Sequence, residues 1–140
     1  MNLNMVELAE YGAEKAHYGQ VDKAGVAYIN HPKAVSKLLN GEKEKICAYL
    51  HDVLEDTDFS EHSLRILFGD EIVDTLLILT HDKNESYDDY IVRISTSPIA
   101  KAVKIADLTH NSDLSRLNTV SDKDYERYKK YQKALSFLKS

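Results

Sequence analysis

The segment from His51 to Asp56 places one imidazole and three carboxylates within six residues. We expect it to form part of a helix that runs from about Glu42 to Glu55. At about 100° per residue, His51, Asp52, Glu55 and Asp56 then share one side of this helix. A bound cation would relieve the repulsion among the three acidic groups, and a neutral imidazole is the commonest metal ligand. The pattern therefore indicates a metal-binding face.

A solvated helix face is the alternative interpretation of the same pattern. Amphipathic helices usually turn a charged side towards water and pack the other side inward. The opposite side of this helix is apolar, with Ile46, Leu50, Val53 and Leu54. Periodicity alone fits both interpretations, so metal-binding partners elsewhere in the chain decide between them.

Two other segments offer such partners. His31 lies directly before Pro32, which favours an extended backbone at His31 and limits its rotation. Asp107 lies beside an apolar stripe that includes Val103 and Ala106. An unpaired carboxylate is expensive to bury there, so Asp107 is expected to be either exposed or coordinated.

As a set, His31, His51, Asp52 and Asp107 form a mixed nitrogen and oxygen site without thiolates. Such a site suits one divalent metal, with manganese, iron, cobalt and zinc as candidates, and does not suit a structural zinc held by cysteines. Four protein ligands on a metal that accepts about six would leave positions for water and substrate.

The order of these motifs resembles that of the HD superfamily, and their residues are similar to those in the hydrolase domain of RelA/SpoT-type proteins. The resemblance runs from about His17 to Asn111. It rests on Tyr28-Ile29-Asn30-His31-Pro32, on His51-Asp52-Val53-Leu54-Glu55-Asp56-Thr57, and on Lys104-Ile105-Ala106-Asp107 followed by His110-Asn111. Proteins of that family remove the 3′-pyrophosphate of the alarmone (p)ppGpp with Mn²⁺. The resemblance therefore implies a metal-dependent phosphohydrolase and, at 140 residues, a stand-alone small alarmone hydrolase.

The resemblance also implies residue roles. The four residues named above match the metal ligands, which implies Mn²⁺ as the metal. Glu55 and Asp56 match the pair that orients and deprotonates the attacking water, so they are the expected catalytic residues. Their place one turn beyond His51 and Asp52 agrees with this role, because it puts them within reach of the metal site.

Three residues are expected to contact the substrate. Lys23 matches a basic residue in the loop before the first metal histidine, where it would contact a phosphate. Asn111 lies one turn after Asp107 and matches a residue that contacts the nucleotide. Tyr128 belongs to an aromatic run near the C-terminus and is the candidate for stacking on a base.

The loop before His31 departs from the family pattern, which commonly has an arginine in the slot of Asp22 and a serine in that of Ala24. An aspartate repels a polyphosphate where an arginine would attract it. Two alternatives to (p)ppGpp hydrolysis therefore stay open. One is an HD-type phosphatase acting on a nucleoside monophosphate or a dinucleotide cofactor. The other is a non-catalytic, metal-containing nucleotide sensor, against which the intact Glu55–Asp56 pair speaks.

Apolar residues recur at helical spacing almost throughout, which predicts an all-α fold. We expect residues 1–140 to form a single HD domain, a compact bundle of about eight helices. The expected helices are Leu3 to about His17, one with Pro32 in its first turn that ends at Asn40-Gly41, Glu42 to about Glu55, Ser60–Phe68, one capped by Asp70 and running through Leu79, Ser86–Ser95, one opened by Pro98 and running through Leu108, and Ser121 to about Lys139.

The composition limits the kinds of molecule that the protein is expected to bind. The net charge of −5 argues against a non-specific nucleic-acid binder, but a local metal can still attract a small anionic nucleotide. The single cysteine, Cys47, lies in an apolar run, so we expect it to pack in the core of a cytoplasmic protein. No run approaches the ~18 apolar residues of a membrane span, and no signal peptide is expected. The sequence makes no prediction of the oligomeric state.

Overall fold

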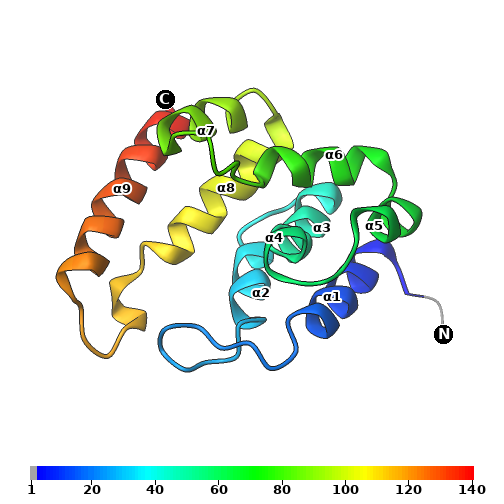
Figure 1. Ribbon diagram of the computed structural model, residues 1–140, viewed down its shortest axis with the longest axis horizontal. Helices are drawn as coiled ribbons and strands as arrows, with labels where there is room; N and C mark the ends of the chain where they lie inside the picture. Colours follow the sequence, from blue (N-terminus) through cyan, green and yellow to red (C-terminus); the bar gives the residue numbers. More distant parts are fainter. Residues whose placement is uncertain (1–2) are drawn as a thin grey trace.

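The computed structural model describes residues 3–140, which contain nine α-helices and one short 3₁₀ helix (Figure 1). They are α1 (Met5–Ala16), α2 (Asn30–Lys37), α3 (Glu42–Leu50), α4 (Val53–Asp56), α5 (Glu61–Phe68), α6 (Asp70–Leu79), α7 (Tyr87–Ile94), α8 (Pro98–Asn111), η1 (Leu114–Arg116) and α9 (Asp122–Lys139). The β-structure of the described residues is one isolated bridge between Val21 and Ala27. The predicted all-α fold is thus confirmed. Within residues 3–140, no helix combines the length and the apolar character needed to cross a bilayer.

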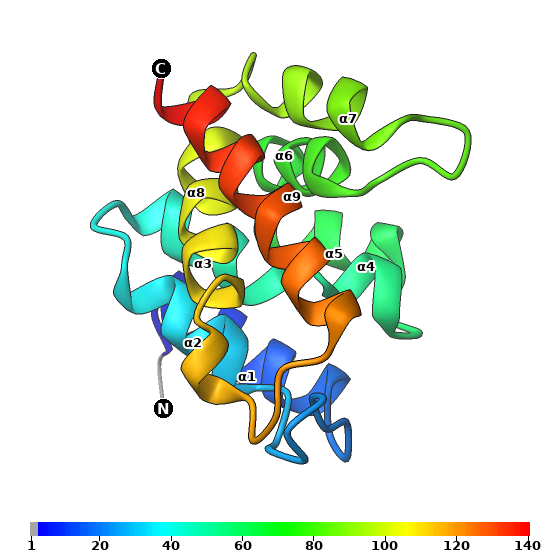
Figure 2. The ribbon, with the colours of Figure 1, turned by 90° about the vertical axis from the view of Figure 1, so that its left-hand side faces the viewer.

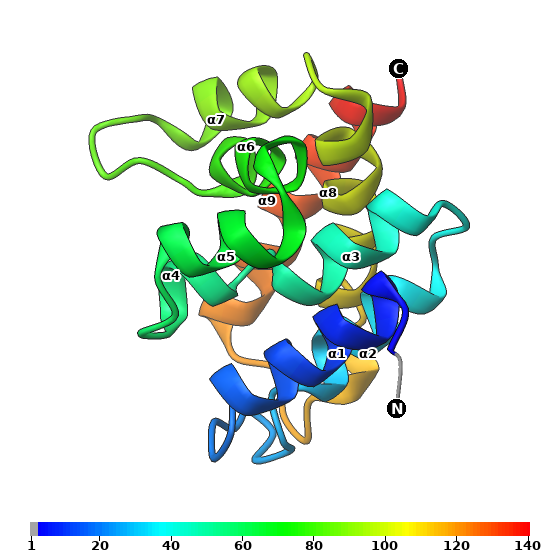
Figure 3. The same ribbon diagram turned by 90° about the vertical axis from the view of Figure 1, so that its right-hand side faces the viewer.

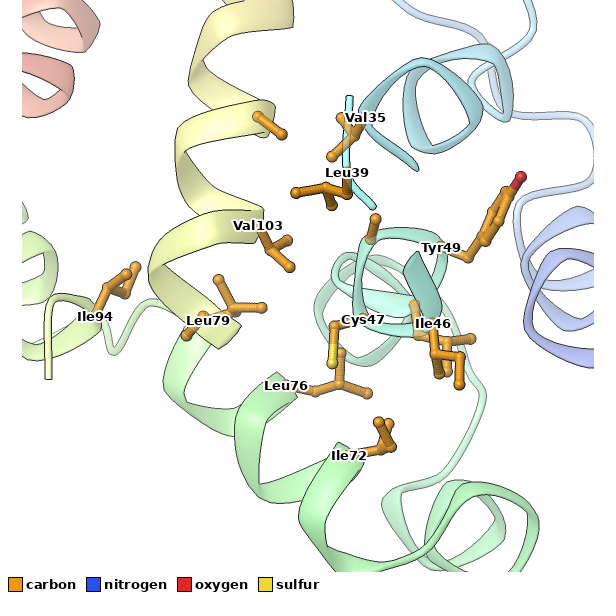
Figure 4. Packing of buried hydrophobic residues seen from close by; sticks show 14 of the residues in the cluster. Val35, Leu39, Ile46, Cys47, Tyr49, Ile72, Leu76, Leu79, Ile94 and Val103 are labelled. Atoms are coloured by element: carbon orange, nitrogen blue, oxygen red, sulfur yellow. The ribbon is translucent and has the colours of Figure 1, made fainter. Parts of the chain in front are cut away.

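Helices α3 and α8 form the centre of the molecule. Helix α3 packs against α1, α2, α6 and α8, while α9 covers the outer side of α8 (Figures 2 and 3). Five consecutive residues of α3, from Ile46 to Leu50, are buried, which is typical of a helix surrounded by others. In Figure 4 Cys47 points into this core between α3 and Leu76 of α6, and it is fully buried as expected. The two central helices carry the histidine–aspartate pair and Asp107 into the interior.

Serine residues cap four of the nine α-helices of the described residues, and these include the helix that we expected to begin at Ser60. The side chains of Ser60, Ser86, Ser97 and Ser121 each accept an N–H from the third residue that follows. The predicted Asp70 cap is wrong. Gly69 lies between α5 and α6 with φ +88°, a conformation that favours glycine, and Asp70 is the first residue of α6.

The predicted continuous helix from Glu42 to Glu55 is also wrong, because it breaks at His51 and Asp52 into α3 and α4. In an uninterrupted helix the carbonyl of Ala48 would accept the backbone N–H of Asp52. Here the His51 ring contacts that carbonyl, with Nδ1 2.6 Å from the Ala48 oxygen. The backbone of Asp52 leaves regular helical geometry, with φ −102° and ψ −1°. The acidic residues therefore do not lie on one straight helical face.

Helix α2 ends at Lys37, three residues before the expected stop at Asn40-Gly41. The backbone N–H groups of Leu38 and Leu39 bond to the carbonyls of Val35 and Ser36, three residues back. This tighter turn closes the helix early.

Core packing can be tested at Leu76, which is fully buried in α6. We expect Leu76→Ala to lower the free energy of unfolding by about 2–5 kcal/mol, because it leaves a cavity between α3 and α6. Urea denaturation measures the loss. The matched control is Ile66→Ala, whose side chain is 71% exposed and should cost less than about 0.5 kcal/mol. Equal losses for the two variants would contradict this packing.

Candidate active site

The four predicted metal ligands converge on one point inside the bundle. His31 comes from α2, His51 and Asp52 from the break between α3 and α4, and Asp107 from α8. His31 Nε2 lies 2.7 Å from Asp107 Oδ1. His51 Nε2 lies 3.1 Å from Asp52 Oδ2 and 3.4 Å from Asp107 Oδ1. Both histidines and Asp107 are buried, so the cluster sits largely out of water.

The backbone at His31 differs from the prediction. A proline disfavours helical geometry at the preceding residue, yet His31 is the second residue of α2. Two hydrogen bonds of its ring offset this preference. His31 Nε2 faces Asp107, and His31 Nδ1 lies 2.7 Å from Nδ1 of His110. The proline still lies in the first turn of the helix, as expected.

The hydrogen bonding of His51 shows that the cluster needs a positive charge. Its Nδ1 donates to the Ala48 carbonyl, so in the neutral ring Nε2 carries a lone pair. This buried Nε2 has no hydrogen-bond partner, and carboxylate oxygens of Asp52 and Asp107 lie beside it. A lone pair facing two carboxylates is unfavourable, so the position requires a positive charge, either from a proton on Nε2 or from a bound cation. A divalent cation among these four side chains would satisfy it, and the donor set suits such an ion.

The pKa values of His51, Asp52 and Asp107 also depend on the charges gathered in this cluster. Burial by itself lowers the pKa of His51, but the charges of Asp52 and Asp107 outweigh it and raise the value well above the ordinary one. Burial raises the pKa of Asp52, yet the neighbouring His51 brings it down to about 2. Burial also acts against ionisation of Asp107, but the ammonium of Lys104 holds its pKa well below the usual range. Both carboxylates are therefore ionised and ready to bind a cation.

A second layer of side chains holds the four. The Tyr28 hydroxyl donates to Oδ2 of Asp52, the oxygen that faces His51. Lys104 and Asn111 contact Asp107 at 3.0 and 3.2 Å. If His31 Nε2 binds a metal, its Nδ1 carries the proton and donates it to His110. Such outer contacts fix the orientation of metal ligands.

Glu55 and Asp56 lie beside this cluster on α4. Together with Asp52 they offer oxygen atoms that all lie within 4.8 Å of one another. The backbone N–H of His81 donates to Glu55 Oε1 at 2.8 Å, which fixes that carboxylate. Burial raises the pKa of both Glu55 and Asp56, and the charge of Asp52 adds to the effect. Raised carboxyl pKa values favour proton acceptance from water near neutral pH.

The cluster opens into a cavity of about 360 Å³, and a second cavity of about 420 Å³ adjoins it. Five residues line both, so the two spaces lie next to each other: Asp22, Tyr28, Asn111, Arg116 and Tyr131. We call them the inner cavity, beside the cluster, and the outer cavity. Both have the size of small-molecule sites.

The structure distributes the predicted substrate residues unequally. Asn111 lines both cavities, whereas Lys23 lines the outer cavity alone. Tyr128 lines neither cavity and instead stacks on Tyr125, with ring centroids 6.0 Å apart. Tyr131, one turn further along α9, faces both spaces. The helical period separates these tyrosines, but only tertiary packing decides which side of α9 faces the cavities.

Comparison with known proteins agrees with this geometry. No family model matches the chain. It is 29% identical over 123 residues to a probable GTP pyrophosphokinase of Mycobacterium leprae, and it spans 16% of that protein's length. It is 33% identical over 126 residues to the guanosine-3′,5′-bis(diphosphate) 3′-pyrophosphohydrolase MESH1 of Danio rerio, covering 80% of this chain and 69% of that protein. This chain belongs to the ppGpp 3′-pyrophosphohydrolase family.

A solved structure supports the same assignment. It belongs to a metazoan ortholog of SpoT that hydrolyses ppGpp, and it matches this chain with a TM-score of 0.79. The match covers 99% of this chain and 86% of the other at 25% identity. That protein therefore shares the arrangement of helices seen in this chain. The chain spans only 14–17% of several long bacterial relatives, which are named as GTP pyrophosphokinases.

The hydroxyl of Tyr28 provides a test of the candidate metal centre. We expect Tyr28→Phe to weaken Mn²⁺ binding by about 10- to 100-fold, because Asp52 loses the donor that orients it. Isothermal titration with Mn²⁺ measures the affinity. Tyr49→Phe is the matched control, since its hydroxyl contacts Glu10 at 3.3 Å and it lines neither cavity. Wild-type affinity in Tyr28→Phe would show that Asp52 needs no such support.

Proposed function

We propose that this chain hydrolyses (p)ppGpp and releases its 3′-pyrophosphate, using Mn²⁺ held by His31, His51, Asp52 and Asp107. The observation that carries the proposal is the buried Nε2 of His51, which has no hydrogen-bond partner among the described residues and lies between two carboxylates. The proposal is supported by relatives named for this reaction. We also propose that residues 1–140 act as a single HD domain in the cytoplasm, where a buried free thiol such as Cys47 stays reduced.

In the proposed reaction, a water oxygen bonds to the phosphorus attached to the ribose 3′-oxygen. The bond from that phosphorus to the 3′-oxygen breaks, the water gives up a proton, and the 3′-oxygen takes up a proton to become a hydroxyl as pyrophosphate is released. When bound, a divalent metal would supply positive charge at the phosphoryl oxygens and lower the pKa of the attacking water. The four ligand side chains would hold it at the inner end of the cavity.

Glu55 and Asp56 are the proposed proton acceptors. Glu55 lines the inner cavity and is fixed by the N–H of His81. Asp56 lies within 4.8 Å of Asp52 and Glu55, close enough to orient the water from a second side. Because partial burial raises the pKa of both carboxyls, each holds a proton taken from water more readily than a carboxylate with an ordinary pKa does.

The remaining cavity residues suit an anionic nucleotide. Arg116 and Lys130 bring positive charge to the inner cavity, and Lys23 and Arg127 bring it to the outer one. Asn111 offers its amide between the two spaces, and the Tyr131 ring offers a face for a base. The nucleotide would therefore place its pyrophosphate at the inner end and extend into the outer cavity.

Two substitutions separate chemistry from metal binding. We expect Glu55→Gln to lower kcat with ppGpp by about 10²- to 10⁴-fold while the Mn²⁺ content stays near wild type, because Glu55 moves a proton and is not a ligand. Asp52→Ala should lose both Mn²⁺ and turnover. Metal analysis and pyrophosphate release provide the two readouts.

Asp58→Asn is the control, because Asp58 is exposed and lines neither cavity. Its turnover should equal that of wild type. A wild-type rate in Glu55→Gln would refute the role given to that residue.

A second candidate function is phosphate release from another nucleotide, such as a nucleoside monophosphate or a dinucleotide cofactor. It is favoured by Asp22, whose carboxylate lines both cavities where the family commonly has an arginine. A substrate panel with Mn²⁺ distinguishes the two functions. Intact ppGpp beside rapid release from another nucleotide would select the second, and tight binding without any product would select a nucleotide sensor.

A further inference from the structure

Asp22 does not stand alone in the cavities, since Arg116 lies against it. The two residues are 94 positions apart in sequence, and Asp22 Oδ2 lies 3.5 Å from Arg116 Nη2. The side chains are 22% and 30% exposed, so water screens their interaction only in part. Both residues line both cavities, which puts this ion pair where the two spaces meet.

The two carboxylate oxygens of Asp22 do different things. Oδ1 accepts the backbone N–H groups of Ala24 and Val26, at 2.9 and 3.0 Å, and so shapes the loop between α1 and α2. Oδ2 faces Arg116. An asparagine could make the two loop hydrogen bonds through its amide oxygen, so the loop does not need the negative charge.

Arg116 is anchored and still able to bind an anion. Its Nη1 donates to the carbonyl of His110 at 3.0 Å, while its Nη2 makes only the long contact with Asp22. A guanidinium held in this way suits a phosphate, which it can bind through two parallel hydrogen bonds.

The other cations of the outer cavity are compensated in the same manner. Lys23 and Arg127 lie 3.7 and 3.2 Å from the same carboxylate oxygen of Asp124. In the outer cavity the cationic side chains are therefore paired with carboxylates. A phosphate that enters must compete with these carboxylates for the cations.

We propose that the Asp22–Arg116 pair limits the number of phosphates that a nucleotide can carry at the end away from the metal ligands. This inference rests on the proposed function, in which the pyrophosphate lies at the inner end and the rest of the nucleotide reaches the pair. A phosphate that binds the guanidinium competes with Asp22 for it, and every further phosphate adds repulsion from that carboxylate. The preferred substrates are then guanosine 3′-diphosphates with few 5′-phosphates.

The test uses guanosine 3′-diphosphates with one, two or three 5′-phosphates. In the wild type, kcat/KM should fall as phosphates are added. Asp22→Asn keeps the loop hydrogen bonds but removes the charge, so it should raise kcat/KM about two- to fivefold for the triphosphate, through KM, and less for the monophosphate. High salt should reduce the difference.

Two further variants isolate the pair. Arg116→Gln should raise KM, and adding Asp22→Asn to it should give a smaller gain than in the wild type, because there is no guanidinium left to release. Glu71→Gln makes the same change in net charge at an exposed pair with Lys43, and Glu71 lines neither cavity. It should leave the order of the three substrates unchanged.

Failure of this inference differs from failure of the proposed function. If ppGpp is hydrolysed but Asp22→Asn leaves the dependence of KM on phosphate number unchanged, the carboxylate only shapes the loop and the inference is overturned. If no variant hydrolyses ppGpp, the proposed function fails, and equilibrium binding of GMP, GDP and GTP decides. Asp22→Asn should then strengthen GTP binding more than GMP binding, and equal changes would overturn the inference.

Discussion

One electrostatic constraint governs the structure. Two carboxylates and two imidazole nitrogens are gathered in the interior, where the carboxylates repel each other and all four groups are largely removed from water. Asp107 is buried against His31 and His51, and within residues 3–140 only Lys104 supplies a fixed positive charge to it. Burying such a group without full compensation costs several kcal/mol, on the order of the net stability of a small domain. A divalent cation bound among these side chains would offset this cost, so binding of the proposed metal would stabilise the fold.

The fold supplies the rigidity that keeps these charges together. The central helices α3 and α8 are packed on several sides, so neither His51 nor Asp107 can move to water without opening the core. The break after α3 turns Asp52 and Glu55 towards the inner cavity. The same His51 ring that ends α3 through the Ala48 carbonyl would offer its other nitrogen to the proposed metal. One side chain thus links the local backbone geometry to the proposed chemistry.

Sequence reasoning anticipated those parts of the molecule that local chemistry determines. The Ser60 cap, the proline at the start of α8 and the apolar period of the helices are local signals, and the structure confirms them. The break at His51 escaped prediction because it depends on a side chain bonding to its own helix. Arg116 escaped because nothing in sequence links it to Asp22, 94 positions away. Tyr131 rather than Tyr128 lines the cavities because the side of α9 that faces them is fixed by packing against α8.

The account is tested most directly by the place where Mn²⁺ binds. Crystals of the protein grown with Mn²⁺ and measured at the manganese absorption edge would give the position of the ion from anomalous scattering. We predict one strong peak per chain, with His31, His51, Asp52 and Asp107 all at ligand distance. A protein that binds Mn²⁺ only elsewhere, or that leaves any of these four side chains outside the coordination sphere, would contradict the account.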